Sequence, residues 1–306
     1  MSFQVTTAQV VEYNNNVELA LQQKTAKLAP YAMQMPGKGE SCEIVNLIGQ
    51  VRGNRADVRH GDTRYVSTPH DRRWVAKRPE YYYADLVDTA DRLTVGIDLQ
   101  GAYVQAGAAT IKRGWDDEWL FGFYSAALTG KTGTTQVAFP AGNIGAVDLG
   151  AAAATGLNMA KIRWAKRRLM ANLVDTDMDE LYIAVTSVQY DNLMNEVQVI
   201  SKDFTSADQK VIESGKLPKI LGFNFIECEY GNTGSFENAG LTLDGSGYRR
   251  VPVWTKSGMA LATWQMMNNS IDRLPGKQQS VQVWSGTTVA ASRTQEGKCL
   301  QLLCAE

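Results

Sequence analysis

Residues 52–78, RGNRADVRHGDTRYVSTPHDRRWVAKR, constrain the fold because a segment this basic cannot lie in a protein core. They carry eight basic and three acidic residues, and unpaired Arg and Lys side chains are almost never buried. The Gly- and Asp-rich centre and the strand-like flanks predict a long β-hairpin over residues 39–85. An isolated two-stranded hairpin is not stable in water. We therefore expect a projecting ribbon that settles on another surface.

The alternative for this ribbon is an irregular, solvated loop. Its aromatic residues favour the hairpin, since large aromatic side chains usually mark packing or an interface anchor. Trp74 and Tyr82 are the candidate apolar anchors. Together with the basic residues they form the predicted contact set: Arg52, Arg55, Arg64, Arg72, Arg73, Trp74, Lys77 and Tyr82.

The residues before the ribbon, 1–38, are typical of a polar arm. Apolar residues recur there at helical spacing, at Val10, Tyr13, Val17, Leu21 and Leu28. The apolar stripe is narrow, so a helix built on it should dock on a partner. The sequence leaves open whether that partner is its own domain or another chain.

After the ribbon, residues 98–128 predict one long helix. Asp98 is a plausible N-cap, and Thr129-Gly130 ends the pattern. The helix contains glycines, each of which costs up to about 1 kcal/mol in a helix interior. Close packing of another backbone would explain them, as would a bend. The glycines are Gly101, Gly107, Gly114 and Gly122.

The rest of the chain alternates between helix and strand. Residues 158–173 and 187–196 predict helices, and residues 181–185 and 220–228 predict strands. This alternation indicates a compact α/β domain that runs to about residue 268. The C-terminal stretch has alternating apolar positions and predicts two or three final strands.

Composition narrows the functional classes. The chain is 44% hydrophobic with a net charge of -1, so it lacks the bulk positive charge that would hold DNA. The first sixteen residues, MSFQVTTAQVVEYNNN, predict no signal peptide, and no apolar run reaches the roughly 18 residues of a membrane helix. The four cysteines are expected to be free thiols in a reducing cytoplasm.

Two nucleotide- and metal-like motifs fail on inspection. Residues 130–132, Gly-Lys-Thr, would need a glycine where Ser125 stands and a preceding strand to form a phosphate loop. The aspartates within residues 175–179 start like a calcium loop, but Thr186 stands where a bidentate glutamate belongs. We expect neither site.

No arrangement supports catalysis. His60 and His70 both fall in the exposed ribbon, which is a poor place for a preorganised base. The carboxylates of residues 116–118 are adjacent on a helix and diverge, so they form no acid/base pair. We predict no enzyme activity, no metal and no cofactor.

At the residue level the chain resembles a known family. The segments that carry the likeness are RHGDTRYVSTPHDRRWV (59–75), AFPAGNIGAVDLGAAAATGLNMAKIRWAKRRLM (138–170), LGFNFIECE (221–229) and GYRRVPVWTKSGMALATW (247–264). In order and spacing they are similar to major capsid proteins of tailed bacteriophages. The resemblance implies the α+β fold of the Hong Kong 97 type.

The resemblance also implies a domain organisation. Residues 1–38 would form an N-terminal arm and 39–85 an extended loop that overlies a neighbouring subunit. Residues 86–156 would form a peripheral domain with a spine helix at 98–128. Residues 157–270 would form the axial domain, and 271–306 would return to the peripheral domain as C-terminal strands. Lys77 lies in the loop, but no crosslink motif accompanies it.

The implied function is a major capsid protein that self-assembles into an icosahedral shell around double-stranded DNA. The implied partners are further copies in hexamers and pentamers, a portal, a separate scaffolding protein and decoration proteins. Contact with packaged DNA would be weak, no membrane is involved, and assembly takes place in the host bacterial cytoplasm before the protein resides in the virion capsid. The alternatives are an encapsulin-like compartment and a hydrolase with an unfamiliar site.

Overall fold

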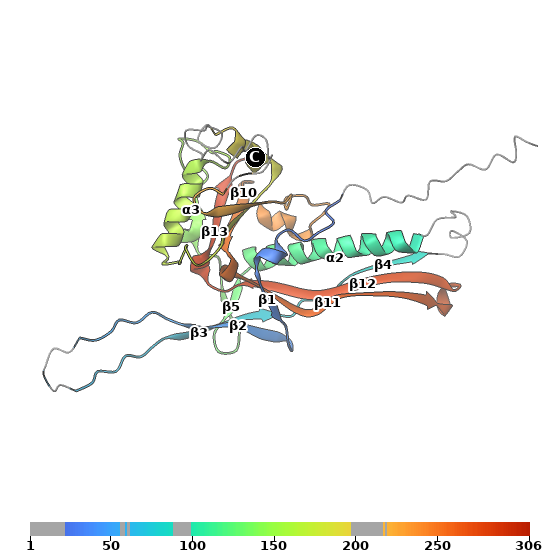
Figure 1. Cartoon of the computed structure of the whole chain (residues 1–306), viewed down its shortest axis with the longest axis horizontal. Coiled ribbons are helices and arrows are strands. Elements are labelled where there is room, and N and C mark those ends of the chain that lie inside the picture. The colour runs from blue at the N-terminus through green and yellow to red at the C-terminus, as the bar shows by residue number, and fades with distance from the viewer. Residues whose placement is uncertain (1–21, 56–58, 60–61, 88–98, 197–216, 218) are drawn as a thin grey trace, which may run out of the picture.

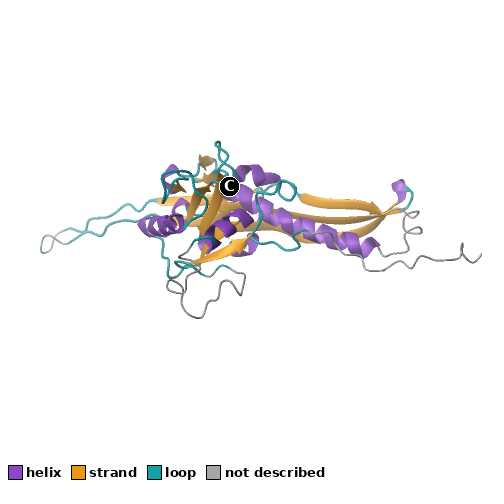
Figure 2. Cartoon of the chain, turned by 90° about the horizontal axis from the view of Figure 1, so that it is seen from above, coloured by secondary structure: helices purple, strands orange, loops and turns teal. Residues whose placement is uncertain are grey.

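The computed structural model describes residues 22–55, 59, 62–87, 99–196, 217 and 219–306. Residues 10–21 of the expected arm helix and the expected cap Asp98 lie outside the described residues. Figures 1 and 2 show an elongated molecule with a hairpin extending from one end and a long sheet at the other. A second, more compact sheet and its helices lie beside the central part of the molecule.

The long sheet is the central structural element of one half of the molecule. Its strands follow the order β1-β11-β12-β4, and helix α2 (Leu99–Tyr124) lies along one face of it (Figure 1). We call the opposite face the outer face. The strands are β1 (Met33–Pro36), β4 (Tyr81–Val87), β11 (Met259–Leu274) and β12 (Ser280–Arg293).

Helix α2 confirms the expected long helix but is shorter than predicted. It ends at Tyr124, and Ala127–Thr129 forms strand β5 instead of a last helical turn. Ala127 and Leu128 favour a helix locally, but β5 pairs with β6 (Thr135–Val137) and with the hairpin. Tertiary pairing therefore outweighs local propensity here.

The glycines of α2 let the long sheet approach the helix closely. This agrees with close packing of another backbone, one of the two explanations considered for these glycines. A Cβ on Gly114 would lie 2.6 Å from Cδ1 of Tyr81, and one on Gly107 would lie 2.9 Å from Cδ1 of Tyr83. A Cβ on Gly122 would collide with the backbone carbonyl of Ala291 in β12. The helix can rest on β12 only because these side chains are absent.

Gly122→Ala should lower the free energy of unfolding by about 1–3 kcal/mol, the usual cost of overpacking a close-packed interior. The neighbour is backbone and cannot rotate away. Urea unfolding measures the change. Gly276→Ala is the matched control, because a Cβ there meets nothing within 4 Å, and it should change stability by less than about 0.5 kcal/mol. Equal effects at both positions would contradict the close approach.

The compact part is a five-stranded sheet in the order β7-β13-β10-β8-β9. The predicted α/β alternation is confirmed by α3 (Met159–Ala171), which Asn158 caps, and by α4 (Ser187–Met194). All five residues of β8 are buried. The strands are β7 (Ile144–Gly145), β8 (Leu181–Val185), β9 (Phe223–Glu227), β10 (Arg249–Thr255) and β13 (Cys299–Cys304).

Sheet membership differs from the expected segment boundaries near the C-terminus. Strand β11 already begins at Met259 and belongs to the long sheet, whereas the expected boundary was about residue 270. The last strand, β13, pairs with β10 in the five-stranded sheet and not with the long sheet. Trp119 of α2 and Trp254 of β10 pack with ring centroids 4.5 Å apart and join the two parts in one core.

The predicted hairpin is present but involves fewer residues than expected. Strands β2 (Ser41–Ile48) and β3 (His70–Ala76) pair antiparallel and continue through β5 and β6 as a third sheet. The expected ribbon reached residue 85, yet β4 pairs with β12 in the long sheet. The connection between β3 and β4 is therefore where the chain passes from the hairpin to the body.

Candidate functional site, the projecting hairpin

The distal hairpin, residues 49–69, extends beyond the paired strands. Its described residues include none that is buried. The amide of Gly49 donates to the carbonyl of Pro69 at 2.8 Å, and Nδ2 of Asn54 donates to the carbonyl of Arg64 at 2.9 Å. Figures 1 and 2 show the described residues of this segment projecting from the rest of the chain. A ribbon of this kind contributes contact area to a partner at no cost to its own core.

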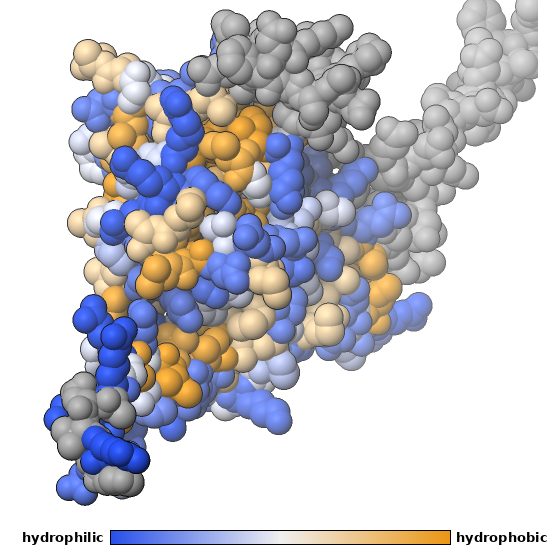
Figure 3. Space-filling view, turned by 60° about the vertical axis from the view of Figure 1, so that its left-hand side comes forward, coloured by the Kyte–Doolittle hydropathy of each residue, from blue (hydrophilic) through white to orange (hydrophobic). Residues whose placement is uncertain are grey.

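Apolar side chains are interleaved with the arginines of this ribbon. Tyr65 is 93% exposed and Ile48, at its base, is 70% exposed. Arg52, Arg55 and Arg64 are exposed beside them, and the protruding hairpin is largely hydrophilic in Figure 3. Exposed Tyr and Arg in one segment are typical of interface hot spots.

Tyr65 is a candidate that the sequence analysis missed. The signal was available, because a tyrosine between Arg64 and Val66 is the lone aromatic between residues 52 and 73. Trp74 and Tyr82, the aromatic residues predicted as anchors, lie at the base of the hairpin and on the body of the molecule.

Two predicted contact residues are used within their own chain. Arg73 is only 8% exposed and lies 3.9 Å from Asp71 and 3.8 Å from Glu296. Nε1 of Trp74 donates to the carbonyl of Gly130 at 2.8 Å. Strand alternation points these neighbours to opposite faces of β3, and each face has its own partner at the base of the hairpin.

The other three predicted residues are exposed but separated. Arg72 lies 3.6 Å from Glu43 across the hairpin. Lys77 follows β3 and is exposed. Tyr82 is 63% exposed on the outer face of the long sheet, with Leu86 at 47%. The structure thus groups Arg52, Arg55 and Arg64 at the distal hairpin and distributes the rest over its base and the body.

Three adjacent carboxylates of α2 each hold a different segment of the chain. Asp116 accepts hydrogen bonds from the amides of Leu28 and Ala29 at 2.8 and 2.9 Å, and Asp117 accepts one from the amide of Asn238 at 2.8 Å. Glu118 pairs with Arg78, with 2.7 Å between Oε2 and Nε. Because they diverge, the three carboxylates serve as three separate anchors, which the spacing alone did not reveal.

Burial is the main cause that raises the pKa of Glu118 to about 7, and Asp117 and Glu237 add to the rise while Arg78 opposes it. The carboxyl has an ordinary value of 4.5. The folded chain therefore binds more protons than the unfolded chain between these two values. This group contributes stability that is complete below about pH 4.5 and is lost as pH rises through about 7.

Glu118→Gln should therefore gain stability relative to the wild type as pH rises from about 5 to about 8, because the amide stays neutral. Urea unfolding at the two pH values gives the difference. Glu180→Gln is the control, since hydrogen bonding from Tyr182 chiefly lowers the pKa of Glu180 and nothing should titrate there between these pH values. A pH-independent difference for Glu118→Gln would contradict the assignment.

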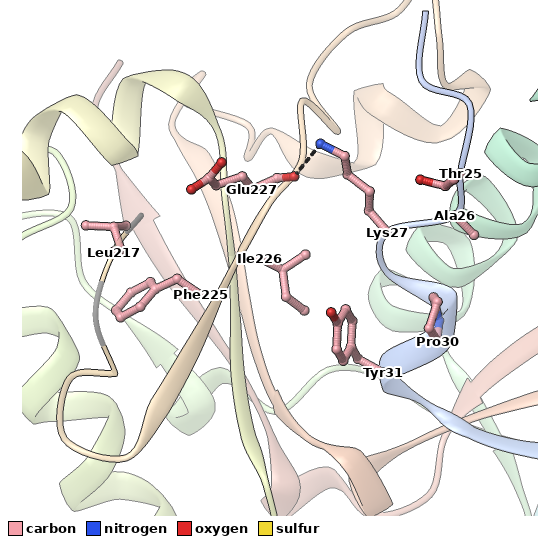
Figure 4. Close-up of a pocket in the computed structure, with 9 residues that line it drawn as sticks. All are labelled: Thr25, Ala26, Lys27, Pro30, Tyr31, Leu217, Phe225, Ile226 and Glu227. Atoms are coloured by element: carbon pink, nitrogen blue, oxygen red, sulfur yellow. Dashed lines mark hydrogen bonds between the residues drawn. The ribbon is translucent and has the colours of Figure 1, made fainter. Parts of the chain in front are cut away.

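A pocket of about 400 Å³ lies between the segment before β1 and the strand β9. Figure 4 shows Nζ of Lys27 donating to the backbone carbonyl of Glu227, at 2.8 Å. More of its lining surface is polar than apolar. The lining residues are Thr25, Ala26, Lys27, Pro30, Tyr31, Leu217, Phe225, Ile226 and Glu227.

Within the described ranges, no three His, Cys, Asp or Glu residues are placed to hold a metal ion. No helix in the same ranges is both long and apolar enough to cross a membrane. All four cysteines are free.

The comparisons with known proteins agree on one kind of protein. A family model described as phage capsid protein matches residues 5–306, whereas no curated protein matches the sequence. The capsid of cyanophage P-SCSP1u has a TM-score of 0.74 at 12% identity, covering 99% of this chain and 94% of that chain. The capsid of cyanophage Pam1 has a TM-score of 0.71 at 13% identity, covering 98% and 97%.

The mature capsid of bacteriophage PhiM1 adds a third likeness, with a TM-score of 0.70 at 10% identity and coverage of 97% and 92%. At identities this low, the structural likeness establishes only the fold. It is a mixed α+β fold shared with phage capsids over nearly the full length of the chain. The family model covers almost the whole sequence and confirms the resemblance found from the residues. The chain belongs to the phage capsid protein family, and it is a structural component of the virion shell and not an enzyme.

Proposed function

We propose that this chain is the major subunit of an icosahedral phage shell and that the distal hairpin of one copy lies across a neighbouring copy. The carrying observation is a ribbon whose described residues are all at least partly exposed and which bears Tyr65, Arg52, Arg55 and Arg64. Such a surface gains stability only by burial against a partner. Another copy of the chain is the partner that a closed shell provides at every position.

The outer face of the long sheet is the receiving surface that fits this hairpin best. Tyr82 and Leu86 leave an apolar area uncovered there. Glu80 and Asp272 are exposed at its margins and carry the charge opposite to that of the arginines. Electrostatic complementarity of this kind sets partner choice and register more than raw affinity.

Contacts of modest strength suffice for this function. Each subunit in a closed shell binds several neighbours at once, so the total affinity far exceeds that of one contact. A hairpin that binds one neighbour and a sheet that receives the hairpin of another form a head-to-tail interface, which generates a ring when the rotation between subunits closes. Hexamers and pentamers are the rings that an icosahedral shell requires.

The remaining partners follow from the same function. A portal, a separate scaffolding protein and decoration proteins would complete the particle. The net charge of -1 favours weak contact with packaged double-stranded DNA, since tight binding needs many phosphate contacts.

Sedimentation and electron microscopy of the purified chain test this function. We expect closed particles or rings of subunits at high concentration, or after co-expression with the genes that neighbour its own. A chain that stays monomeric under both conditions would contradict the proposal.

A further inference from the structure

The base of the hairpin is fixed to the C-terminal half of α2 at two points. The first is Arg78, in the connection between β3 and β4. Its Nε lies 2.7 Å from Oε2 of Glu118, and its guanidinium lies 3.7 Å from the ring centroid of Phe121. A cation held both by a carboxylate and by an aromatic face has little freedom to rotate.

The second point is Arg73 within β3. Its Nη1 lies 3.8 Å from Oε1 of Glu296, and the other carboxylate oxygen of Glu296 accepts from Nε of Arg293 at 2.8 Å. Arg293 in turn donates to the carbonyls of Phe123 and Ser125 at the end of α2. Glu296 therefore links the hairpin to the helix end through two arginines.

The ion pair of Arg73 with Glu296, at 3.8 Å, is longer than the 2.7 Å pair of Arg78 with Glu118. Nε and Nη1 of Arg73 and Oε1 of Glu296 are buried without a hydrogen-bond partner, and so are Nε of Arg78 and Oε2 of Glu118, although only 2.7 Å separates those two atoms. Buried polar groups in that state are costly, so a small rotation of the hairpin that shortens the 3.8 Å separation would be favourable.

We infer that Arg73 and Arg78 are positioning residues that set the direction in which the hairpin leaves the body, and thereby the geometry of the shell. This inference rests on the proposed function of the distal hairpin. With about 3.3 Å per residue, a ten-residue arm is about 33 Å long, so a rotation of about 10° at its base moves the tip by about 6 Å. A shift of that size removes the side chains of the tip from their partner.

The expected effect on assembly follows from the fraction of subunits in the competent direction. If loss of an anchor leaves one subunit in ten correctly directed, the apparent affinity of each contact falls about tenfold. The fold of the subunit does not depend on that direction.

The experiment measures the direction itself. Spin labels at Ser67→Cys on the hairpin and Arg163→Cys on α3, both exposed sites, report a distance distribution in a Cys42→Ser background. Arg78→Met with Glu118→Gln removes the first anchor without leaving a buried charge. Glu296→Gln weakens the second. We expect both variants to widen or shift the distribution, to lower the apparent affinity of each contact about tenfold and to lower shell yield by at least that factor.

Arg249→Met is the matched control, because Arg249 and Glu306 form an equally close pair at 2.7 Å in the compact part. It should lower stability without changing the label distances. Charge exchange, Arg78→Glu with Glu118→Arg, should restore both distance and yield. Unchanged distances in both anchor variants would overturn the inference, even if changes at the distal arginines still prevented assembly. Normal assembly with altered distal arginines would instead overturn the proposed function.

Discussion

Arg293→Met should lower the free energy of unfolding by about 3–5 kcal/mol, the usual cost of removing one partner from a buried ion pair. The Arg293 side chain is fully buried. Besides Glu296 at 2.8 Å, it binds the carbonyl of Ser125 at 2.6 Å and packs over the ring of Phe139. Methionine would fill much of the volume but would remove the donor to the partly buried carboxylate of Glu296 and to the carbonyls of Phe123 and Ser125.

Urea unfolding measures this loss, and Arg273→Met is the control. Arg273 lies in the neighbouring strand β11 but is exposed, so its replacement should cost less than about 0.5 kcal/mol. A loss below about 1 kcal/mol for Arg293→Met would mean that water replaces the guanidinium at the helix end, and the anchor at Arg73 would then lack a rigid base.

Reversing the charge of the distal hairpin, with Arg52, Arg55 and Arg64 all changed to Glu, should abolish shell formation while the subunit stays folded. All three side chains are exposed, so stability should change little. Like charges placed together across an interface cost several kcal/mol, and about 3 kcal/mol per contact corresponds to a hundredfold loss of affinity. Sedimentation gives the assembled fraction, and thermal unfolding shows that the subunit is intact.

Two controls distinguish loss of the hairpin contact from a general effect of net charge on assembly. Reversal of Arg163, Arg167 and Lys277, which are exposed elsewhere, changes the net charge equally and should reduce assembly much less. Tyr65→Ser should weaken assembly without any change in charge. Equal loss in the charge control, together with normal assembly of Tyr65→Ser, would show that the hairpin is not a specific contact.

The structure also changes which arginines provide a clean test. Reversal of Arg72 and Arg73 follows from the sequence, where both stand in the same basic ribbon. Because Arg73 is buried beside Glu296, a glutamate there would place two carboxylates together and would damage the subunit itself. A change restricted to the distal arginines avoids this ambiguity.

Local patterns predicted those parts of the fold whose partners are close in sequence. The hairpin, the helix α2 and the helix α3 follow from turn residues, periodicity and the cap Asn158. Pairings between distant segments left no local trace. No local pattern predicts that β4 pairs with β12, or that β13 pairs with β10 after the β11–β12 hairpin.

The candidate site was predictable to the same extent. A basic ribbon that cannot be buried was evident from composition, and so were Arg52, Arg55 and Arg64. The intrachain contacts of Arg73 and Trp74 were not predictable, because they depend on Glu296 and Gly130, which only the folded chain brings near. Arginines that are adjacent in one strand cannot be distinguished by sequence alone. The residue that each contacts in the folded chain decides whether it is buried and contributes to stability or stays exposed.

A reconstruction of the assembled shell by cryo-electron microscopy tests the central claim most directly. We expect residues 49–69 of each subunit to lie across a neighbouring subunit, with Tyr65 covered and the distal arginines close to acidic side chains of that neighbour. Hairpins that fold back over their own subunit, or that extend into solvent with nothing beneath them, would contradict it.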